Sequence, residues 1–438
     1  MPSKVQFRLL FLAFVIEACY CYLVSLGDLQ RQIPQMWAGV FPAFLCYVFA
    51  AYLVLRPDAP PGRPHLILGA ALVFRLTLWW SPATLSDDIF RYVWDGRVQL
   101  AGINPYLYAP SATQVAHLRD ALYQSVNHAD IPTIYPPLAQ LFFRAICALS
   151  ATPAAFKLAL LLCDWGLCLL LAHSLVRRGQ DPRRVVLYAW NPLPLIEVAG
   201  SGHIDALGVL LLFAALYALH SQRWAAAVCG LAGAFLVKLV PLVLLPTFWR
   251  RPRADWFNFR KRSALLLFPV LGLLAFWPFA DAGEKLATGL LTYVQHWHFN
   301  AAAYSLFHFA LQSWDGHAYA HARWLCTALF ALVALGVQIR YRDPYRAAFA
   351  TLGAYVLLSP TVHPWYLLWV LPFLVFFPSP AWVLLSGLIF LAYEVQIGYG
   401  SEGVWCEKPW VLWAQYAPFY LVLGITAYYR RLMGRRDD

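Results

Sequence analysis

The chain has 438 residues, of which 61% are hydrophobic, 16% are aromatic and only 13% are charged. This composition excludes an ordinary soluble domain and a disordered chain, because both carry many more polar and charged residues. Apolar runs long enough to cross a bilayer recur from one end to the other, so the sequence predicts an all-α, polytopic membrane protein.

The formal net charge is +11, and the chain contains nine cysteines. In a membrane protein we interpret the basic residues as topology signals and as contacts to anionic membrane lipids, so we expect no nucleic-acid partner. The cysteines lie mostly inside apolar runs, without a CxxC pair or a Cys/His ligand spacing. Neither a zinc site nor a disulfide framework is therefore expected.

Proline, glycine and charge clusters separate the apolar segments, and we expect about 12–14 transmembrane helices in a single domain, 1–438. The candidate spans cover roughly 7–26, 37–55, 65–81, 153–176, 184–200, 204–220, 223–238, 239–249, 262–280, 323–340, 345–359, 364–378, 381–398 and 410–429. The amphipathic segment 136–150 begins YPPL and is short, so we expect a helix that lies along the membrane interface.

Five clusters of lysine and arginine indicate the orientation of the chain. They lie near the N-terminus and at 177–184, 250–262, 340–346 and 430–436. The positive-inside rule places all five in the cytoplasm. This requires the segment 223–249 to cross twice, with a break near Lys238. The loops 82–135 and 281–322 and the turns 200–205 and 359–366 then face the outside together.

The most unusual stretch reads SDDIFRYVWDGRVQLAGINPYLY, residues 86–108, and it follows an apolar run directly. Asp87 and Asp88 form an acidic pair at the mouth of a membrane helix, where charge is costly unless it meets water, a cation or a substrate. The alternative is that Ser86 or Asp87 caps a helix that begins near Ile89.

A helix over about 88–100 places Asp88, Arg91, Tyr92 and Asp95 on one polar face, since they are spaced i, i+3, i+4 and i+7. Further along, Tyr135 stands in the motif TIYPP. It either shapes a turn or binds a sugar ring through its aromatic face and its hydroxyl.

Three more groups of ionisable residues lie inside apolar stretches. His203 and Asp205 occur in GSGHID, with Glu197 on the same span, and they form either a functional group or a satisfied structural network. No third ligand stands at helical spacing, so no metal site is expected there. Lys238 needs an anion, either a lipid-linked phosphate or a carboxylate of a neighbouring helix. His363 lies between two prolines and is placed to donate to a phosphate or a leaving group.

Six motifs of the chain together resemble a known superfamily. They read SDDIFRYVWDG, GINPYLYAP, TIYPPLAQ, WNPLPLIEVAGSGHIDAL, LVKLVPLVLLP and SPTVHPWYLLW. They resemble the integral-membrane C-type (GT-C) glycosyltransferases, and among these the bacterial polyprenyl-phosphate-mannose-dependent mannosyltransferases. The likeness spans roughly residues 65–380. It implies a GT-C-like bundle with interfacial helices in the first long external loop.

The resemblance also implies a reaction. The donor is a sugar, here mannose, linked through phosphate to a polyprenol, and the acceptor is a lipid or a glycan. An acidic residue after an early transmembrane helix is the catalytic base, and the order SDD leaves Asp88 and Asp87 equally eligible. One base with cationic stabilisation of the leaving group suits inversion.

We expect the other site residues to divide between the two parts of the donor. The expected phosphate-binding residues are Lys238, His363 and Arg91, and the expected substrate-binding residues are Asp95, Tyr135, His203 and Asp205. No cofactor is certain, although an acidic pair is able to hold Mg²⁺ or Mn²⁺. The expected location is the bacterial cytoplasmic membrane, with the site facing the periplasm or the exterior.

Two other classes of protein fit part of the pattern. A transporter or lipid flippase would use the ionisable residues as a relay near the bilayer midplane. A structural assembly subunit would carry no chemistry. The acidic pair stands in a long outer loop, and many ionisable residues lie on one side of the membrane, so the sequence favours an enzyme.

Overall fold

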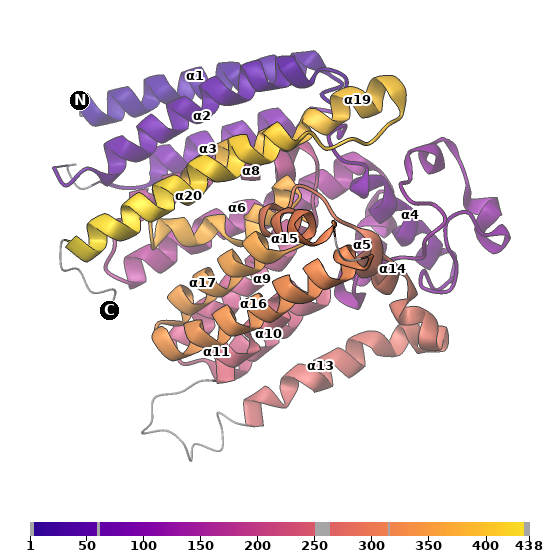
Figure 1. Ribbon diagram of the computed structural model, residues 1–438. Coiled ribbons are helices and arrows are strands. Elements are labelled where there is room, and N and C mark those ends of the chain that lie inside the picture. Colours follow the sequence, from indigo (N-terminus) through magenta and orange to yellow (C-terminus); the bar gives the residue numbers. More distant parts are fainter. Residues whose placement is uncertain (1–3, 59–61, 250–262, 314–315, 433–438) are drawn as a thin grey trace. The chain divides into compact units, whose positions relative to one another are not determined.

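The computed structural model describes residues 4–58, 62–249, 263–313 and 316–432 (Figure 1). Within these ranges the chain forms helices and turns, and its only β-type pairing is an isolated bridge between Phe299 and Thr361. Seven helical stretches there are long and apolar enough to cross a membrane: Lys4–Leu26, Ile33–Leu55, Pro153–Arg177, Ser263–His296, Ala318–Arg340, Pro380–Tyr399 and Pro409–Leu432. The all-α, polytopic fold is confirmed.

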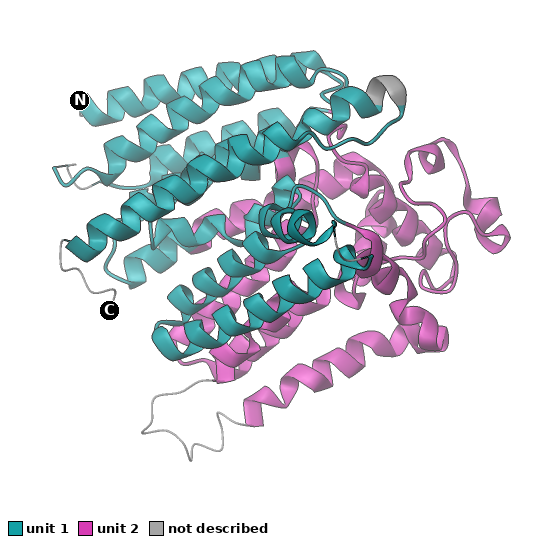
Figure 2. Cartoon of the chain, viewed as in Figure 1, with its two compact units in different colours: residues 1–81, 171–196, 298–438 teal, residues 82–170, 197–297 magenta. Residues whose placement is uncertain are grey.

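The chain forms two compact units, which Figure 2 colours separately. Unit 1 comprises residues 1–81, 171–196 and 298–438, and unit 2 comprises residues 82–170 and 197–297. Helix α6 (Pro153–Arg177) begins in unit 2 and ends in unit 1.

Unit 1 contains long helices from both ends of the chain. Its elements are α1 (Lys4–Leu26), α2 (Ile33–Leu55), α3 (His65–Trp79), η3 (Pro182–Val185), α7 (Val186–Ala189), α8 (Pro192–Pro194), α15 (Ala302–Leu311), α16 (Ala318–Arg340), α17 (Pro344–Leu358), η8 (Pro364–Trp369), η9 (Leu371–Val375), α18 (Pro380–Leu388), η10 (Ile389–Glu394), α19 (Val395–Glu402) and α20 (Pro409–Leu432). The buried guanidinium of Arg75 donates to the carbonyls of Ala71 and Ala189, both at 3.0 Å, and so joins α3 to α7. This satisfies a charge that the apolar core could not otherwise hold.

The span expected over 184–200 is not one continuous helix. Helix α7 stops at Ala189, and the Asn191 side chain accepts from the amide of Leu193 at 3.0 Å and so starts α8. Pro192 removes a backbone donor, and the chain then enters a π-helical turn, η4 (Leu195–Gly200). The span expected over 364–378 is likewise two short 3₁₀ segments, η8 and η9, with prolines near their starts.

Unit 2 contains shorter elements and the long polar loop. They are α4 (Asp88–Leu100), η1 (Thr113–Leu118), η2 (Ala121–Ser125), α5 (Pro137–Leu149), the larger part of α6, α9 (Asp205–His220), α10 (Trp224–Val237), η5 (Val240–Leu244), α11 (Leu245–Trp249), α13 (Leu267–Phe276), η7 (Trp277–Ala287) and α14 (Thr288–His296). Helix α4 packs on α5, and α9 packs on α10.

Helix α5 is the element expected to lie along the membrane interface. Its 13 residues span about 20 Å, which is short of the roughly 30 Å of a hydrocarbon core. Pro137, Ala139, Gln140, Phe143 and Cys147 are buried on one side, whereas Arg144, Ala145, Ala148 and Leu149 are exposed. Its length and its two faces fit the expectation, which remains a prediction about the membrane.

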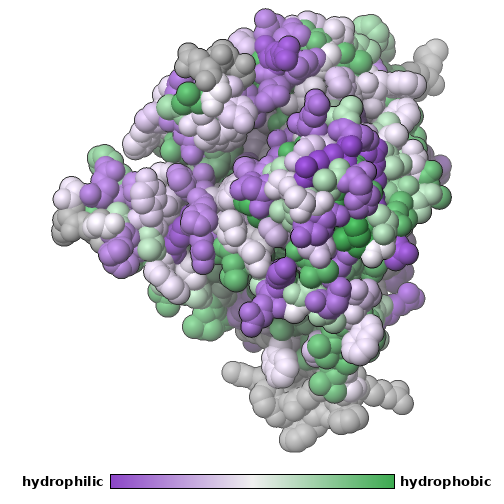
Figure 3. Space-filling view, turned by 90° about the vertical axis from the view of Figure 1, so that its right-hand side faces the viewer, coloured by the Kyte–Doolittle hydropathy of each residue, from purple (hydrophilic) through white to green (hydrophobic). Residues whose placement is uncertain are grey.

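The loop between α4 and α5 is polar on its outer side. Its exposed residues include Thr113, Gln114, His117, Asp120 and Gln124. Figure 3 looks onto the right-hand side of Figure 1, where α4 and this loop lie, and hydrophilic residues gather on that face. Such a surface belongs in water or among lipid head groups rather than in hydrocarbon.

The expected break near Lys238 is confirmed. Helix α10 ends at Val237, and Lys238 has an extended backbone with φ −154° and ψ 135°. Pro241 then stands at the start of η5. The basic cluster 250–262 and the end of the cluster 430–436 lie outside the described residues.

Gly96 permits the close contact of α4 with α5. A Cβ at this position would lie 2.5 Å from the Cys147 Sγ and 2.6 Å from the carbonyl oxygen of Phe143. Because the second atom belongs to the backbone, a side chain there forces the helices apart. Gly69 in α3 has no atom within 4 Å of its equivalent position.

We predict that Gly96→Ala lowers the stability of the protein by about 1–3 kcal/mol, as overpacking of a core does. Gly69→Ala is the matched control and should keep or raise stability, since alanine favours helix by about 1 kcal/mol. The thermal unfolding midpoint of each purified variant in detergent is the measurement. An unchanged midpoint in Gly96→Ala would show that α4 and α5 are not in tight contact.

Candidate active site

The acidic pair stands where α4 begins. Asp88 is the first residue of the helix and Asp87 occupies the capping position, yet the Asp87 side chain makes no capping hydrogen bond. The hydroxyl of Ser86 accepts from the Asp88 amide only at a long 3.4 Å. The capping alternative therefore does not account for these carboxylates, whose oxygens turn toward other partners.

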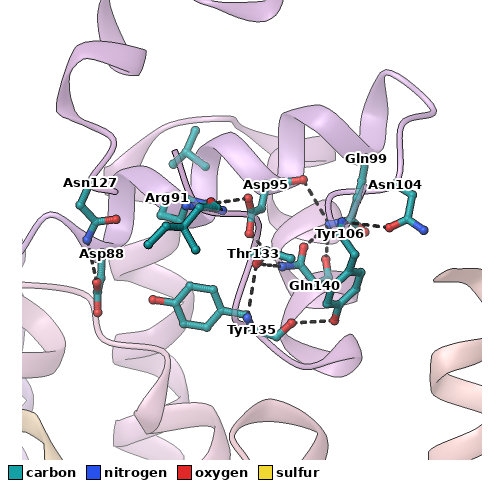
Figure 4. Close-up of polar contacts among 12 residues, drawn as sticks. Asp88, Arg91, Asp95, Gln99, Asn104, Tyr106, Asn127, Thr133, Tyr135 and Gln140 are labelled. Atoms are coloured by element: carbon teal, nitrogen blue, oxygen red, sulfur yellow. Dashed lines mark hydrogen bonds and ion pairs between the residues drawn. The ribbon is translucent and has the colours of Figure 1, made fainter. Parts of the chain in front are cut away.

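Asn127 is the partner that the two carboxylates share. Its Nδ2 donates to the Asp87 Oδ1 at 2.7 Å and to the Asp88 Oδ1 at 3.2 Å. Figure 4 shows the Asn127 side chain turned toward Asp88. One amide thus holds two adjacent acids side by side at the start of a helix, where the positive end of the helix dipole also favours negative charge.

An apolar cluster beneath the polar loop positions Asn127. Trp94 and Val98 of α4 pack with Val115 and Val126 of the loop, and all four are buried. Asn127 follows Val126 directly, so burial of that valine places the Asn127 side-chain amide beside the acidic pair. The buried apolar residues of this loop therefore position the polar residue that contacts Asp87 and Asp88.

The pair has an unusual protonation equilibrium. The protein packed around Asp87 and, next, the charge of Asp88 raise the pKa of Asp87 to about 6, although the residue keeps an exposed surface. The hydrogen bond from Asn127 acts in the opposite direction. A carboxyl group that titrates this close to neutral pH suits proton transfer.

His203 lies behind Asp88. Its Nδ1 is 3.8 Å from the Asp88 Oδ2, and its Nε2 is 3.2 Å from the Glu197 Oε2. The side chains of His203 and Glu197 are 1% and 0% exposed, whereas that of Asp88 is 23% exposed. The histidine therefore lies between a carboxylate that reaches the surface and one that does not.

The backbone around His203 is specialised. Glu197 lies in the π-helical turn, and its carbonyl accepts from the His203 amide at 3.1 Å. Gly202 has φ +80°, and a Cβ there would lie 2.6 Å from the Ile89 Cδ1 and 3.1 Å from the Lys157 Cγ. The positive φ favours glycine at this position, and a side chain there would also have to displace the Ile89 methyl group.

Lys238 has a protein carboxylate as its partner. Its Nζ lies 2.7 Å from the Asp205 Oδ1 and 3.0 Å from the Oδ2. The Asp205 side chain is 1% exposed and that of Lys238 is 22% exposed. This is the second of the two partners that the sequence left open, and a phosphate at Lys238 would be an additional anion.

Arg91 and Asp95 form a buried pair one helical turn apart. The Arg91 Nε donates to the Asp95 Oδ1 at 3.0 Å, and the Arg91 Nη2 donates to the carbonyl of Ile131 at 2.9 Å. Gln140 of α5 donates to the Asp95 Oδ2 at 2.9 Å and to the Thr133 hydroxyl at 2.7 Å (Figure 4). This network fastens the end of the loop to α4 and α5.

Tyr135 belongs to an aromatic cluster in the same unit. Its ring meets those of Tyr92 and Phe143 edge to face, at 5.0 and 5.4 Å between centroids. Its carbonyl accepts from the Tyr106 hydroxyl at 2.7 Å. The residue is 9% exposed, so most of its ring is covered by protein.

His363 belongs to unit 1. Its ring stacks on Trp365 at 4.4 Å with an interplanar angle of 4°, and it lies 5.0 Å from the ring of Phe299. Both aromatic neighbours fix the plane of the imidazole. Its contact with a donor phosphate remains a prediction.

Two residues of this site were not singled out from the sequence. Asn127 lies in a loop with many polar residues, so nothing in the sequence distinguishes it. Lys157 is 2% exposed in the apolar helix α6, near Gly202, and a lysine in such a run was an available signal. Among the residues that the structure describes, no three His, Cys, Asp or Glu side chains gather closely enough to hold a metal ion.

Comparison with known proteins gives the class. The family model described as alpha-(1->6)-mannopyranosyltransferase, N-terminal domain, of the MptA_B family, matches residues 25–250. No curated protein and no solved structure matches this chain. The chain is therefore a multi-pass membrane glycosyltransferase of the GT-C kind.

Because the match covers more than half of the 438 residues, the chain belongs to the alpha-(1->6)-mannopyranosyltransferase family. It is a mannosyltransferase. This result decides against the transporter and the structural subunit, which the sequence had kept as alternatives.

We predict that Asn127→Ala moves the acidic limb of the pH–rate profile to higher pH. The Asn127 hydrogen bond lowers the pKa of Asp87, so its loss lets that pKa rise further above about 6 and leaves less carboxylate at a given pH. Gln114→Ala, which changes an exposed amide of the same loop, is the control and should leave the profile unchanged. A profile of Asn127→Ala that matches the wild type would mean that the ionisation of Asp87 does not govern the rate.

Proposed function

We propose that the protein transfers mannose, with inversion, from a polyprenyl-phosphate-linked donor to a lipid or glycan acceptor on the outer face of a bacterial cytoplasmic membrane. The observation that carries this proposal is the acidic pair. Two carboxylates share one amide donor at a surface that a substrate can reach, and one of them has a pKa of about 6.

The pair supplies the catalytic base. Asp88 or Asp87 takes the proton of the acceptor hydroxyl as its oxygen attacks the anomeric carbon of the donor, and the bond from that carbon to the phosphate oxygen breaks. We favour Asp88, because it has an ionisable neighbour behind it and a 23% exposed side chain in front. General-base catalysis of this kind contributes about 10²–10⁴-fold to a rate.

The arrangement of the two acids supports inversion. A retaining enzyme needs two carboxylates on opposite faces of the sugar. Here the Oδ1 atoms of both residues turn toward the same nitrogen of Asn127, so the two groups lie beside one another. They are placed to act on one face only.

Charge on the departing phosphate requires cations. Lys238 stands at a break between two apolar helices and is 22% exposed, which suits a partner that enters from the lipid. Its Nζ contacts both carboxylate oxygens of Asp205, so a phosphate would bind there as a second anion. His363 and Arg91 are further candidates, although Arg91 already pairs with Asp95.

The remaining predicted residues contact the substrate or position the residues that do. Asp95 acts through the network that holds the loop, and Tyr135 offers the uncovered part of its ring to a sugar. Asp205 acts through Lys238.

The outward orientation of the site rests on the basic clusters, which the positive-inside rule assigns to the cytoplasm. The MptA_B family match supports mannose as the transferred sugar.

We predict that Asp88→Asn lowers turnover by about 10²–10⁴-fold while donor binding is retained. Asp87→Asn tests the other member of the pair, and Asp130→Asn, which changes an exposed acid of the same loop, is the control. Mannosyl transfer and donor binding are measured on each purified variant. Near-normal rates in both Asn variants of the pair would exclude it as the base, and recovery only with excess divalent metal would identify a metal site instead.

We predict that removal of the Lys238 charge weakens donor binding by about ten- to a hundred-fold, because a hydrogen bond to a charged group is worth about 1.5–3 kcal/mol. Lys238→Met alone leaves the Asp205 carboxylate buried without its cation. The variant to measure is therefore the double change Lys238→Met with Asp205→Asn, with Asp205→Asn alone as the control. Equal donor affinity in the double variant and in its control would restrict the lysine to a structural ion pair.

A further inference from the structure

Asp88, His203 and Glu197 form a line from the surface into the protein. The exposed fraction of the side chain falls along this line from 23% through 1% to 0%. Two carboxylates thus face the two nitrogens of a single imidazole. The inference below rests on the proposed role of Asp88 as the base.

Glu197 orients the histidine from the buried end of the line. A carboxylate that is 0% exposed is costly unless it accepts a hydrogen bond or faces a positive charge. The His203 Nε2 lies 3.2 Å from the Glu197 Oε2, so this ring nitrogen is placed to carry a proton toward the carboxylate. The neutral imidazole then carries no proton on Nδ1, and this atom faces Asp88.

An imidazole without a proton on Nδ1 can accept a hydrogen bond from protonated Asp88, but it can make none with the Asp88 carboxylate. A carboxylate oxygen and an Nδ1 lone pair are both acceptors, and they stand 3.8 Å apart, beyond a hydrogen bond. Once Asp88 carries a proton, its hydroxyl can donate to Nδ1. Catalytic hydrogen bonds are often longer in the ligand-free enzyme and shorten in the complex.

We propose that His203, oriented by Glu197, receives the proton that Asp88 removes from the acceptor. The acceptor O–H bond breaks toward Asp88, the new bond forms between the acceptor oxygen and the anomeric carbon, and the electron pair of the old bond leaves with the phosphate. The proton then passes from Asp88 to the His203 Nδ1, and Glu197 stabilises the resulting imidazolium. His203 is thus a positioning residue for the base, whereas the sequence indicated a substrate ligand.

Other charged and titratable groups surround this line. Asp87 lies beside Asp88, and the hydroxyl of Tyr92 accepts from the amide of Ile204 at 3.4 Å. Lys157 of α6 approaches Gly202, and Asp205 follows two residues after His203 with its own cation. These groups are neighbours of the line, and the two nitrogens of His203 face Asp88 and Glu197.

The test compares His203→Gln, Glu197→Gln and a matched control, His220→Gln, which changes the exposed histidine at the other end of α9. A glutamine amide cannot take and pass on a proton. We expect His203→Gln to lower kcat by about 10²-fold, with the KM values for donor and acceptor within about two-fold of the wild type. His220→Gln should behave as the wild type does.

Glu197→Gln supplies a readout that a merely structural role would not change. The Glu197 carboxylate stabilises the imidazolium that forms when His203 takes the proton, so its loss should lower kcat. The KM values for donor and acceptor should stay within about two-fold of the wild type, because Glu197 acts on the charged state of His203 and not on the substrate. If His203→Gln does not fold, as judged by its melting midpoint, this separation of kcat from KM in Glu197→Gln decides the matter.

Three results would overturn the relay. They are an unchanged kcat in His203→Gln, a raised KM with kcat retained, which marks a substrate ligand, and an unchanged kcat in Glu197→Gln. Asp88→Asn is measured in the same series. A fully active Asp88→Asn would remove the base itself, whereas an inactive Asp88→Asn with a normal His203→Gln would remove the relay alone.

Discussion

Pairing of buried charges is the constraint on which the architecture of unit 2 depends. The ionisable groups of the candidate site lie at the protein surface or beneath it, and where they are buried an isolated charge costs several kcal/mol. The structure meets this cost with specific partners: Asp87 and Asp88 share Asn127, Lys238 contacts Asp205, Arg91 contacts Asp95, and His203 contacts Glu197.

Irregular backbone gathers where these pairs lie. The π-helical turn that holds Glu197, the positive φ of Gly202 and the extended backbone of Lys238 all interrupt apolar helices. In a regular helix the backbone N–H and C=O groups bond to one another, and the side chains follow a fixed period of 3.6 residues. Interruptions release polar groups and redirect side chains, which is why membrane proteins tolerate them at sites that water or a substrate reaches.

The sequence predicted the parts that depend on composition and on local rules. Apolar runs predicted the all-α membrane fold, and the prolines that flank Lys238 predicted the break in the helix there. The break in the span over 184–200 comes from Asn191 and Pro192, which are local signals inside an otherwise apolar run. Two other features depend on distant contacts and could not be predicted. Asn127 reaches the acidic pair because Val126 packs on α4. Lys238 follows α10 and contacts Asp205 at the start of α9. Sequence spacing alone could not decide between that carboxylate and a phosphate as its partner.

We propose Asp88 as the residue at which mannosyl transfer takes place. The most direct measurement is an electron cryomicroscopy structure of Asp88→Asn with a polyprenyl-phosphate-linked mannose and an acceptor glycan bound. We predict that the acceptor hydroxyl lies about 2.6–3.2 Å from the side chain of residue 88, with the anomeric carbon beyond it and the phosphate on the far side of the sugar. A donor head group bound away from residues 87 and 88, with the pair contacting only Asn127, would contradict the account.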